Sequence, residues 1–315
     1  MTIICVGMAV VDILVQGFDG TPTPGTTAFV DRVGMGVGGD ALNQASALAK
    51  LGHRCQLVTA VGDDAAGRLI KDSCADAGVD TATIVTDPEL DTSTSVVLID
   101  RAGERSFLSG RGGSADQLGA RHVDEARLAQ DVSVLSVGSL FTSPEFDRDV
   151  LPGLLDWAHA RGAITVADLV TDHPEVTLDD LKDVLARLDF VVPSEAESLH
   201  YAGTADPAEA AAVFASYGVG TTVIKRGVRG AVAVRGDKQV SVSTFVVPVV
   251  DTTGSGDSFV AGFVSGLADG LRLGDCLNRA AATAAVSVQG LGATSAIAGL
   301  AQVNELIAIG RRRTT

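Results

Sequence analysis

The chain has 315 residues, of which 46% are hydrophobic and only 4% aromatic, and its formal net charge is −15 at pH 7. This composition predicts a globular protein with a core of Ala, Val, Leu and Ile. The acidic balance argues against a nucleic-acid binder, which needs clustered Lys and Arg. The basic run from Arg311 to Arg313 is interpreted as a solvated end.

Targeting signals and cysteine chemistry are also constrained by the sequence. It contains no stretch of 18 apolar residues and no basic segment before its first apolar run, so we expect neither a membrane span nor a signal peptide, and a cytoplasmic protein. The cysteines are scattered without a C-x-x-C pair, which indicates buried, reduced thiols. The histidines show no metal-ligand spacing.

Apolar strand-like runs alternate with helical patterns along most of the chain. The predicted strands cover residues 2–7, 55–62, 132–138, 163–168, 189–194 and 221–227. The predicted helices cover residues 40–52, 66–78, 151–162, 181–188 and 208–218. Such βαβ alternation predicts an α/β protein with a mostly parallel central sheet between two layers of helices.

Two stretches, residues 13–38 and 91–113, break this alternation because they combine short strand patterns with turn residues. The second is expected to form a hairpin that turns at residues 101–104. We expect the two inserts to form a small β lid on a single domain spanning residues 1–315, over the carboxyl ends of the strands, where such folds bind ligands.

The stretch "VVDTTGSGDSFVAGFVSGL" at residues 249–267 carries the strongest chemical signal. Apolar residues recur at helical spacing after Asp257, so a helix is predicted to start near it. Its unpaired first amides, preceded by the small residues 254–256, suit a phosphate. A carboxylate there would repel that ligand. Its presence therefore needs a reason, such as accepting a proton as a general base. Asp is also a favoured helix N-cap, and the residues alone leave both roles open.

The segments "DTTGSGDSF" and "GVGGDALNQASALAKLG" resemble the C-terminal signature and the N-terminal glycine-pair motif of the ribokinase-like (PfkB-type) carbohydrate kinases. The resemblance covers essentially the whole chain in order, including "PSEAE" at 193–197, "IKRGVRG" at 224–230 and "QGLGA" at 289–293. It implies the ribokinase-like three-layer α/β/α fold with a small β lid.

The resemblance also implies roles for individual residues. The implied catalytic set is Asp257 as the base, with the amides of Gly254, Ser255 and Gly256 as the anion hole. The implied sugar-binding set is Asp12, Gly38, Gly39 and Asn43. The implied nucleotide-binding set is Lys225, Arg226, Gly227, Gly230 and Ser194. Glu197 would organise Mg2+ through water, and a monovalent cation, K+, would lie at Asp251, Thr253, Ser287, Gly290 and Gly292.

Two positions depart from the family pattern. Ser194 replaces the asparagine of the N-x-x-E element, which puts part of the magnesium network in doubt. Asp40 stands where ribokinases carry a lysine, so strict ribose specificity is not expected. An acidic side chain at that place also disfavours a substrate that is already phosphorylated.

Other functions fit the motifs less well. Residues 34–39, "GMGVGG", match the dinucleotide-binding G-x-G-x-x-G, but they do not follow the first buried strand. A hydrolase nucleophile at Ser258 lacks both the second glycine and a downstream histidine. A non-catalytic sugar sensor is disfavoured because Asp257 and its glycines are intact.

The sequence therefore predicts an enzyme that transfers the γ-phosphoryl group of ATP to a hydroxyl of a small carbohydrate of the ribose, fructose or 2-keto-3-deoxygluconate type. A nucleoside kinase of the same fold is the alternative. Mg2+ and K+ are the expected cofactors. A homodimer that pairs through the lids is the expected assembly, because the inserts expose strand edges.

Overall fold

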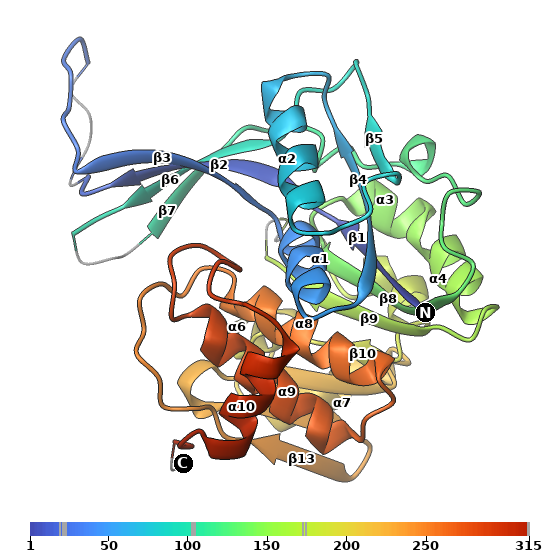
Figure 1. Ribbon diagram of the computed structural model, residues 1–315. Coiled ribbons are helices and arrows are strands. Elements are labelled where there is room, and N and C mark those ends of the chain that lie inside the picture. The colour runs from blue at the N-terminus through green and yellow to red at the C-terminus, as the bar shows by residue number, and fades with distance from the viewer. Residues whose placement is uncertain (19, 21–23, 102–104, 172, 174, 314–315) are drawn as a thin grey trace.

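Two β-sheets organise the chain in the computed structural model, which describes residues 1–18, 20, 24–101, 105–171, 173 and 175–313. Figure 1 shows a body in which helices cover both faces of the larger sheet, and a smaller sheet that projects from it as an arm. The mostly parallel sheet and its two helical layers confirm the predicted α/β fold class.

The larger sheet has nine strands over the described residues, in the order β13-β12-β11-β10-β9-β8-β1-β4-β5. Its strands are β1 (Thr2–Gly7), β4 (Arg54–Val61), β5 (Ile84–Thr86), β8 (Val132–Leu140), β9 (Ile164–Leu169), β10 (Phe190–Val191), β11 (Thr221–Lys225), β12 (Ala231–Arg235) and β13 (Lys238–Val242). Pairing is parallel from β5 to β11, whereas β12 runs antiparallel to both of its neighbours.

Strand alternation builds two cores, one on each face of this sheet. In β1, Ile3 and Cys5 join one buried cluster while Ile4 and Val6 join the other, because successive side chains point to opposite faces. The first core packs α1 (Asp40–Lys50), α2 (Ala65–Asp76), α8 (Ser255–Ala268), α9 (Leu273–Ser287) and α10 (Leu300–Ile309). The second core packs α3 (Pro144–Asp149), α4 (Leu151–His159), α5 (Lys182–Leu185) and α7 (Pro207–Ser216). The remaining α-helix is α6 (Glu195–Ala202).

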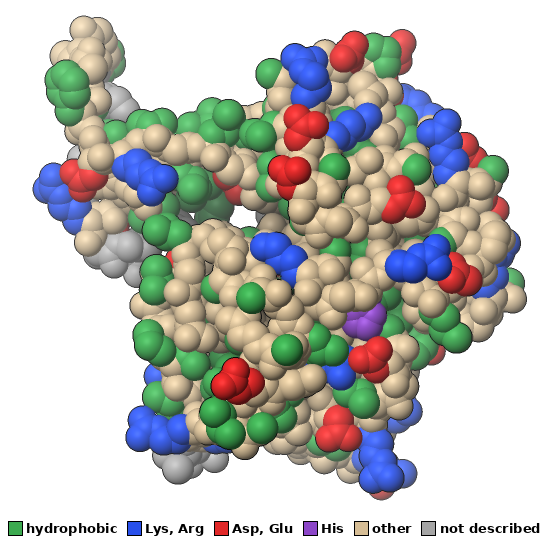
Figure 2. All heavy atoms as spheres, viewed as in Figure 1, with side chains coloured by type: hydrophobic (Ala, Val, Ile, Leu, Met, Phe, Trp, Pro, Cys, Tyr) green, Lys and Arg blue, Asp and Glu red, His purple; other side chains and the backbone are tan. Residues whose placement is uncertain are grey.

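The arm is a four-stranded sheet, counted over the described residues, in the order β3-β2-β6-β7. Its strands are β2 (Val10–Gln16), β3 (Arg32–Gly38), β6 (Thr94–Ile99) and β7 (Arg105–Ser109). It combines the two predicted inserts, although its first strand begins at Val10 and not at residue 13. Most of the predicted turn, residues 102–104, lies outside the described residues. Figure 2 shows hydrophobic side chains gathered over the arm and a hollow between it and the body.

Other predicted segments are confirmed only in part. The helix predicted near Asp257 is confirmed: it starts at Ser255, and Gly254, in a left-handed conformation, is its N-cap. The helix predicted over residues 181–188 is a 3₁₀ turn at Asp179–Leu181 followed by the single turn of α5. The basic run is not solvated throughout, because the backbone around Arg312 pairs with Phe245.

The cysteine prediction is confirmed, since Cys5, Cys55, Cys74 and Cys276 are all buried free thiols. Burial raises the pKa of Cys55 and Cys74 to about 12 and that of Cys276 to about 11. Within the described part of the chain, no helix combines the length and the apolar character needed to cross a membrane.

Candidate active site

The start of α8 places an acidic side chain beside unpaired backbone amides. Gly254 has φ 64°, and a Cβ at this position would lie 2.4 Å from the Cβ of Ala293, so only glycine fits there. The Ser255 amide donates to the Thr252 carbonyl at 3.2 Å. The amides of Gly256 and Asp257 donate to no acceptor among the described residues. These two amides, at the positive end of the helix dipole, form a site suited to an anion.

Asp257 is the third residue of α8 and not its N-cap, so the structure gives its carboxylate no capping role. The side chain is 8% exposed, and its Oδ2 accepts a hydrogen bond from Asn43 Nδ2 at 2.8 Å. Burial and, to a lesser extent, the charge of Asp168 raise the pKa of Asp257, the Asn43 hydrogen bond lowers it, and the net pKa is about 6. Asn43 thereby holds the carboxylate in place at the mouth of the anion site.

A second acidic group, Asp40, lies in the first turn of α1 and interacts with Asp257. Burial raises the pKa of Asp40 well above its usual range, and the charges of Asp257 and Asp168 add to this effect. The Ser139 hydroxyl donates to Asp40 Oδ2 at 2.9 Å. Ser139 has φ 71°, a conformation that is uncommon for a residue with a side chain. The end of β8 is thus bent so that Ser139 reaches Asp40.

Lys225, at the end of β11, supplies the positive charge of the site. Its Nζ donates to Asp168 Oδ1 at 2.5 Å, and a Cβ on Gly256 would lie 3.7 Å from the same nitrogen. Burial alone would lower the pKa of Lys225, but the charges of Asp168 and Glu197 raise it above its usual value. The ammonium group therefore stays charged next to the amides that open α8.

Ser194 and Glu197 form a capping box at the start of α6. The Glu197 amide donates to Ser194 Oγ at 3.2 Å, and the Ser194 amide donates to Glu197 Oε2 at 2.6 Å. Ser194 thus caps α6, and Glu197 uses only Oε2 in this capping box, which leaves Oε1 available. Mg2+ at nucleotide sites is held through one or two carboxylates, water and phosphate oxygens, and the position of Glu197 fits that pattern.

Most of these groups line one cavity of about 490 Å³, although Asn43 and Ser139 do not. The lining at the site described above consists of Asp40, Asp168, Ser194, Glu197, Lys225, Ser255, Gly256 and Asp257. The cavity is also lined by apolar residues of the 244–249 loop and of α9 and its C-terminal end, here called the apolar slot: Phe245, Val247, Val249, Ala281, Ala284, Ala285 and Val288. From the predicted nucleotide set, Gly227 and Gly230 also line the cavity, whereas Arg226 lies outside it. Charged groups together with an apolar slot suit a ligand with a charged tail and a flat base.

The glycine pair lies where β3 meets α1. A Cβ on Gly38 would lie 2.3 Å from Asp12 Oδ2, and one on Gly39 would lie 2.5 Å from the Met8 carbonyl oxygen. The pair therefore allows β2 and β3 to reach the start of α1, which carries Asn43. Asp12, Gly38 and Gly39 lie near this junction at the base of the arm, and Asn43 connects it to Asp257.

The residues predicted for a monovalent cation gather around Asp251. Its Oδ1 accepts hydrogen bonds from the Thr253 amide at 2.9 Å and the Thr253 hydroxyl at 2.6 Å. Its Oδ2 accepts from the Gly292 amide at 2.9 Å. Ser287 ends α9, and the Gly290 amide donates back to its carbonyl at 3.4 Å. Asp251 thus joins the loop before Gly254 to the loop after α9. No group of three or more His, Cys, Asp or Glu side chains arranged for a metal occurs in the described part of the chain.

Sequence reasoning missed two side chains of this site, Asp168 and Ser139. Both lie near the carboxyl ends of observed strands, Asp168 in β9 and Ser139 in β8, where parallel sheets place ligand-binding residues. Asp168 closes the predicted strand "AITVAD", so its position could have been used as a signal.

Comparison with known proteins finds a matching family profile, similar sequences and similar structures. A sequence profile described as pfkB family carbohydrate kinase matches residues 2–298. The ribokinase of Haemophilus influenzae is 28% identical over 282 residues, which are 87% of this chain and 88% of that protein. The fructokinase of Vibrio alginolyticus is 30% identical over 234 residues, which cover 72% of this chain and 75% of that protein.

A solved structure from E. coli, described as ribokinase II in complex with ATP and Mg2+, superposes with a TM-score of 0.84. It is 26% identical in sequence, and the match covers 98% of this chain and 99% of that one. The ribokinase-like fold predicted from the sequence is thereby confirmed.

Proposed function

The chain belongs to the pfkB family of carbohydrate kinases, and from this premise we propose that it transfers the γ-phosphoryl group of ATP to a hydroxyl of an unphosphorylated sugar. One observation carries the proposal: a buried carboxylate, Asp257, lies beside free amides at the start of α8 and inside the cavity. This is the arrangement that a general base and an anion hole require.

Each group has a defined task in this reaction. Asp257 accepts the proton of the attacking hydroxyl as the new bond to phosphorus forms. The amides of Gly256 and Asp257 and the ammonium group of Lys225 stabilise the charge on the transferring phosphoryl oxygens. Glu197 would hold Mg2+ through water, and the ion would add positive charge at the phosphates. The apolar slot between the 244–249 loop and α9 takes the adenine.

The acceptor is expected to lie between the arm and Asp257. We assign Asp12, the glycine pair and Asn43 to its hydroxyls and the arm to the role of a lid, because these residues lie at the base of the arm and Asn43 contacts Asp257. Asp40 adds a second carboxyl group there, which offers no positive charge to bind a phosphate group on the acceptor. Ribose, fructose, 2-keto-3-deoxygluconate and nucleosides all satisfy this condition, and the nucleosides make the alternative function.

The experiment is a phosphorylation screen over these sugars and nucleosides with magnesium-ATP. ADP release is measured with and without each acceptor, for the wild type and for Asp257→Asn. We expect release to depend on one class of acceptor and to be lost in the variant. ADP release that no acceptor stimulates, or that the variant retains, would contradict the proposed function.

We also propose that K+ activates the enzyme. The support is that Asp251 connects the loop before Gly254 with the loop after α9, so a cation there would order the start of α8. Turnover should be higher in potassium than in sodium or choline salts at equal ionic strength. Equal rates in all three salts would remove this proposal.

Pairing of two arms into a homodimer is the expected assembly. The arm exposes large hydrophobic side chains, namely Val33, Met35, Phe107 and Leu108, each at least 60% exposed. Exposed apolar surface of this kind on a sheet favours association. Sedimentation velocity should give a dimer at micromolar concentration, and Met35→Glu should shift it toward the monomer. A monomeric wild type would contradict this assembly.

A further inference from the structure

A second cavity, of about 840 Å³, adjoins the nucleotide slot and has an unusual lining for so acidic a protein. Over the described residues, its lining contains five arginines and no acidic side chain. The lining residues are Arg226, Val228, Arg229, Ser243, Val246, Arg311, Arg312 and Arg313, which we call the arginine groove. Val228 and Arg313 also line the active-site cavity, so the two spaces are neighbours.

One wall of the groove is the segment 311–313, which is anchored to the 243–246 loop. The Val246 amide donates to the Arg311 carbonyl at 2.8 Å, and the Arg313 amide donates to the Thr244 carbonyl at 2.9 Å. The Arg312 guanidinium stacks on Phe245 at 3.8 Å and donates to the Ser243 carbonyl at 2.6 Å. These contacts of Arg312 hold the segment against the 243–246 loop in an extended conformation.

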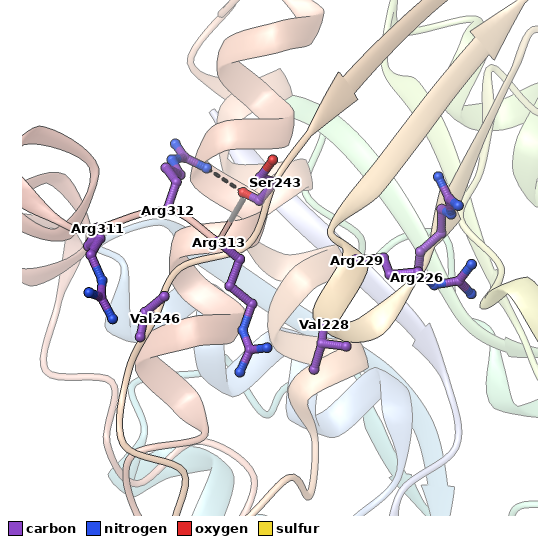
Figure 3. Close-up of a pocket in the computed structure, with 8 residues that line it drawn as sticks. All are labelled: Arg226, Val228, Arg229, Ser243, Val246, Arg311, Arg312 and Arg313. Atoms are coloured by element: carbon purple, nitrogen blue, oxygen red, sulfur yellow. Dashed lines mark hydrogen bonds between the residues drawn. The ribbon is translucent and has the colours of Figure 1, made fainter. Parts of the chain in front are cut away.

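The extended backbone sends the two flanking arginines to the same side. Side chains two residues apart on such a backbone share a face and are spaced about 7 Å apart. Figure 3 shows Arg311 and Arg313 pointing to one side and Arg312 to the other. Both flanking side chains are exposed, and neither makes an ion pair with a described residue.

Two more arginines line the groove. Arg226 and Arg229, on the loop after β11, share a single carboxylate, Glu195, and Figure 3 shows their side chains directed away from Arg311 and Arg313. Five guanidinium groups thus have one acidic partner among the described residues, in a chain whose net charge is −15. Like charges gathered without neutralisation repel one another, and a bound anion removes that repulsion.

We infer that the arginine groove binds a polyphosphate, and that it does so while the active-site cavity holds its nucleotide. Arginine is suited to this ligand because its planar guanidinium makes paired hydrogen bonds to phosphate oxygens. Two free guanidiniums spaced along one extended segment match an anion with several phosphate groups better than a single phosphate. The exposed Val228 and Val246 leave room for an organic part. The ligand is therefore either a free polyphosphate or the phosphate tail of a second nucleotide.

The test measures binding and not turnover, so it stands apart from the proposed reaction. Inorganic tripolyphosphate is titrated calorimetrically at fixed free Mg2+, into protein alone and into protein saturated with a non-hydrolysable ATP analogue. The variant Arg311→Gln/Arg313→Gln removes the two free groove cations. Arg68→Gln/Arg127→Gln removes two exposed arginines near the opposite edge of the sheet and is the matched control.

We expect tripolyphosphate to bind the analogue-saturated wild type and the control variant, and to bind the groove variant about tenfold or more weakly. Binding that the analogue abolishes, or that the groove variant retains in full, would overturn the inference.

Titrating the analogue itself separates the two ligand sources. A second equivalent, bound by the wild type and lost in the groove variant, identifies a nucleotide as the ligand. A single equivalent in both assigns the groove to free polyphosphate. If the analogue fails to bind at all, the proposed function fails, but tripolyphosphate binding to the two variants still decides this inference.

Discussion

Replacing Asp257 by asparagine should make the protein more stable and nearly inactive. The structure gives Asp257 a pKa of about 6, whereas an unfolded Asp has a pKa near 3.9. Above pH 6 the folded protein therefore holds a carboxylate that burial disfavours. The difference of about 2 units corresponds to an upper value of about 3 kcal/mol in the free energy of unfolding, since each unit is worth 1.36 kcal/mol. Asparagine removes this cost and still accepts the hydrogen bond from Asn43.

The pH dependence of the effect follows from the raised pKa. Because of Asp257, the folded state binds more protons than the unfolded state between about pH 4 and pH 6. The contribution of Asp257 to the free energy of unfolding of the wild type therefore falls as the pH rises through that window. The gain in the free energy of unfolding from Asp257→Asn should reach its full value at pH 7.5 and should vanish toward pH 4. Urea unfolding at both pH values measures it. In the same preparations, turnover should fall by about 10² to 10⁴, the contribution of a general base.

Asp147 offers a matched control. Burial raises its pKa to about 7, it accepts a hydrogen bond from the Phe141 amide at 2.9 Å, and it does not line the active-site cavity. Asp147→Asn should also stabilise the protein at pH 7.5 but should leave turnover within about threefold of the wild type, outside the range expected of a base. If Asp257→Asn destabilised the protein, or lost no more activity than Asp147→Asn, the argument for a buried base would be wrong.

Three further predictions follow from the site and the cores. The value of kcat/KM should fall about tenfold for each pH unit below about pH 6, because protonated Asp257 cannot accept a proton, and a flat acid limb would contradict this assignment. Gly254→Ala should lower the free energy of unfolding by more than about 1 kcal/mol, because Gly254 has a positive φ and its added Cβ would lie close to Ala293. Gly274→Ala is the control, because a Cβ there would have its nearest neighbour at 3.7 Å, and it should not destabilise the protein. Equal urea midpoints for the two variants would refute this reasoning. The four buried cysteines should react with a thiol reagent at pH 8 only after unfolding, and rapid labelling of the native protein would show that a thiol is accessible.

The sequence allowed the central strands and the start of α8 to be predicted because these features are local. Apolar periodicity indicates a strand or helix within one segment, and the glycines before Asp257 mark a phosphate-binding turn by their spacing alone. The sequence located the helix start only approximately, near Asp257. It could not show that a Cβ at residue 254 would lie 2.4 Å from the Cβ of Ala293, because that residue lies far along the chain.

Contacts between distant segments could not be predicted in the same way. The hydrogen bond from Ser139 to Asp40 and the pair of Lys225 with Asp168 depend on which strands lie side by side and on a bent strand end. The basic run shows the same limit. Its composition suggested a solvated end, but its extended backbone finds a partner in the 244–246 segment, and this pairing directs Arg311 and Arg313 into a groove.

The transfer of phosphate itself is the most direct test of the proposed function. Using the best acceptor from the screen, ³¹P NMR follows the γ-phosphate of ATP in the presence of the wild-type enzyme and of Asp257→Asn. With the wild type, we predict that the γ signal declines in step with the growth of a phosphomonoester on the acceptor and of ADP, and that the variant leaves the spectrum unchanged over the same time. Conversion of the γ-phosphate to inorganic phosphate alone, with no ester formed, would contradict the assignment of this site to a sugar kinase.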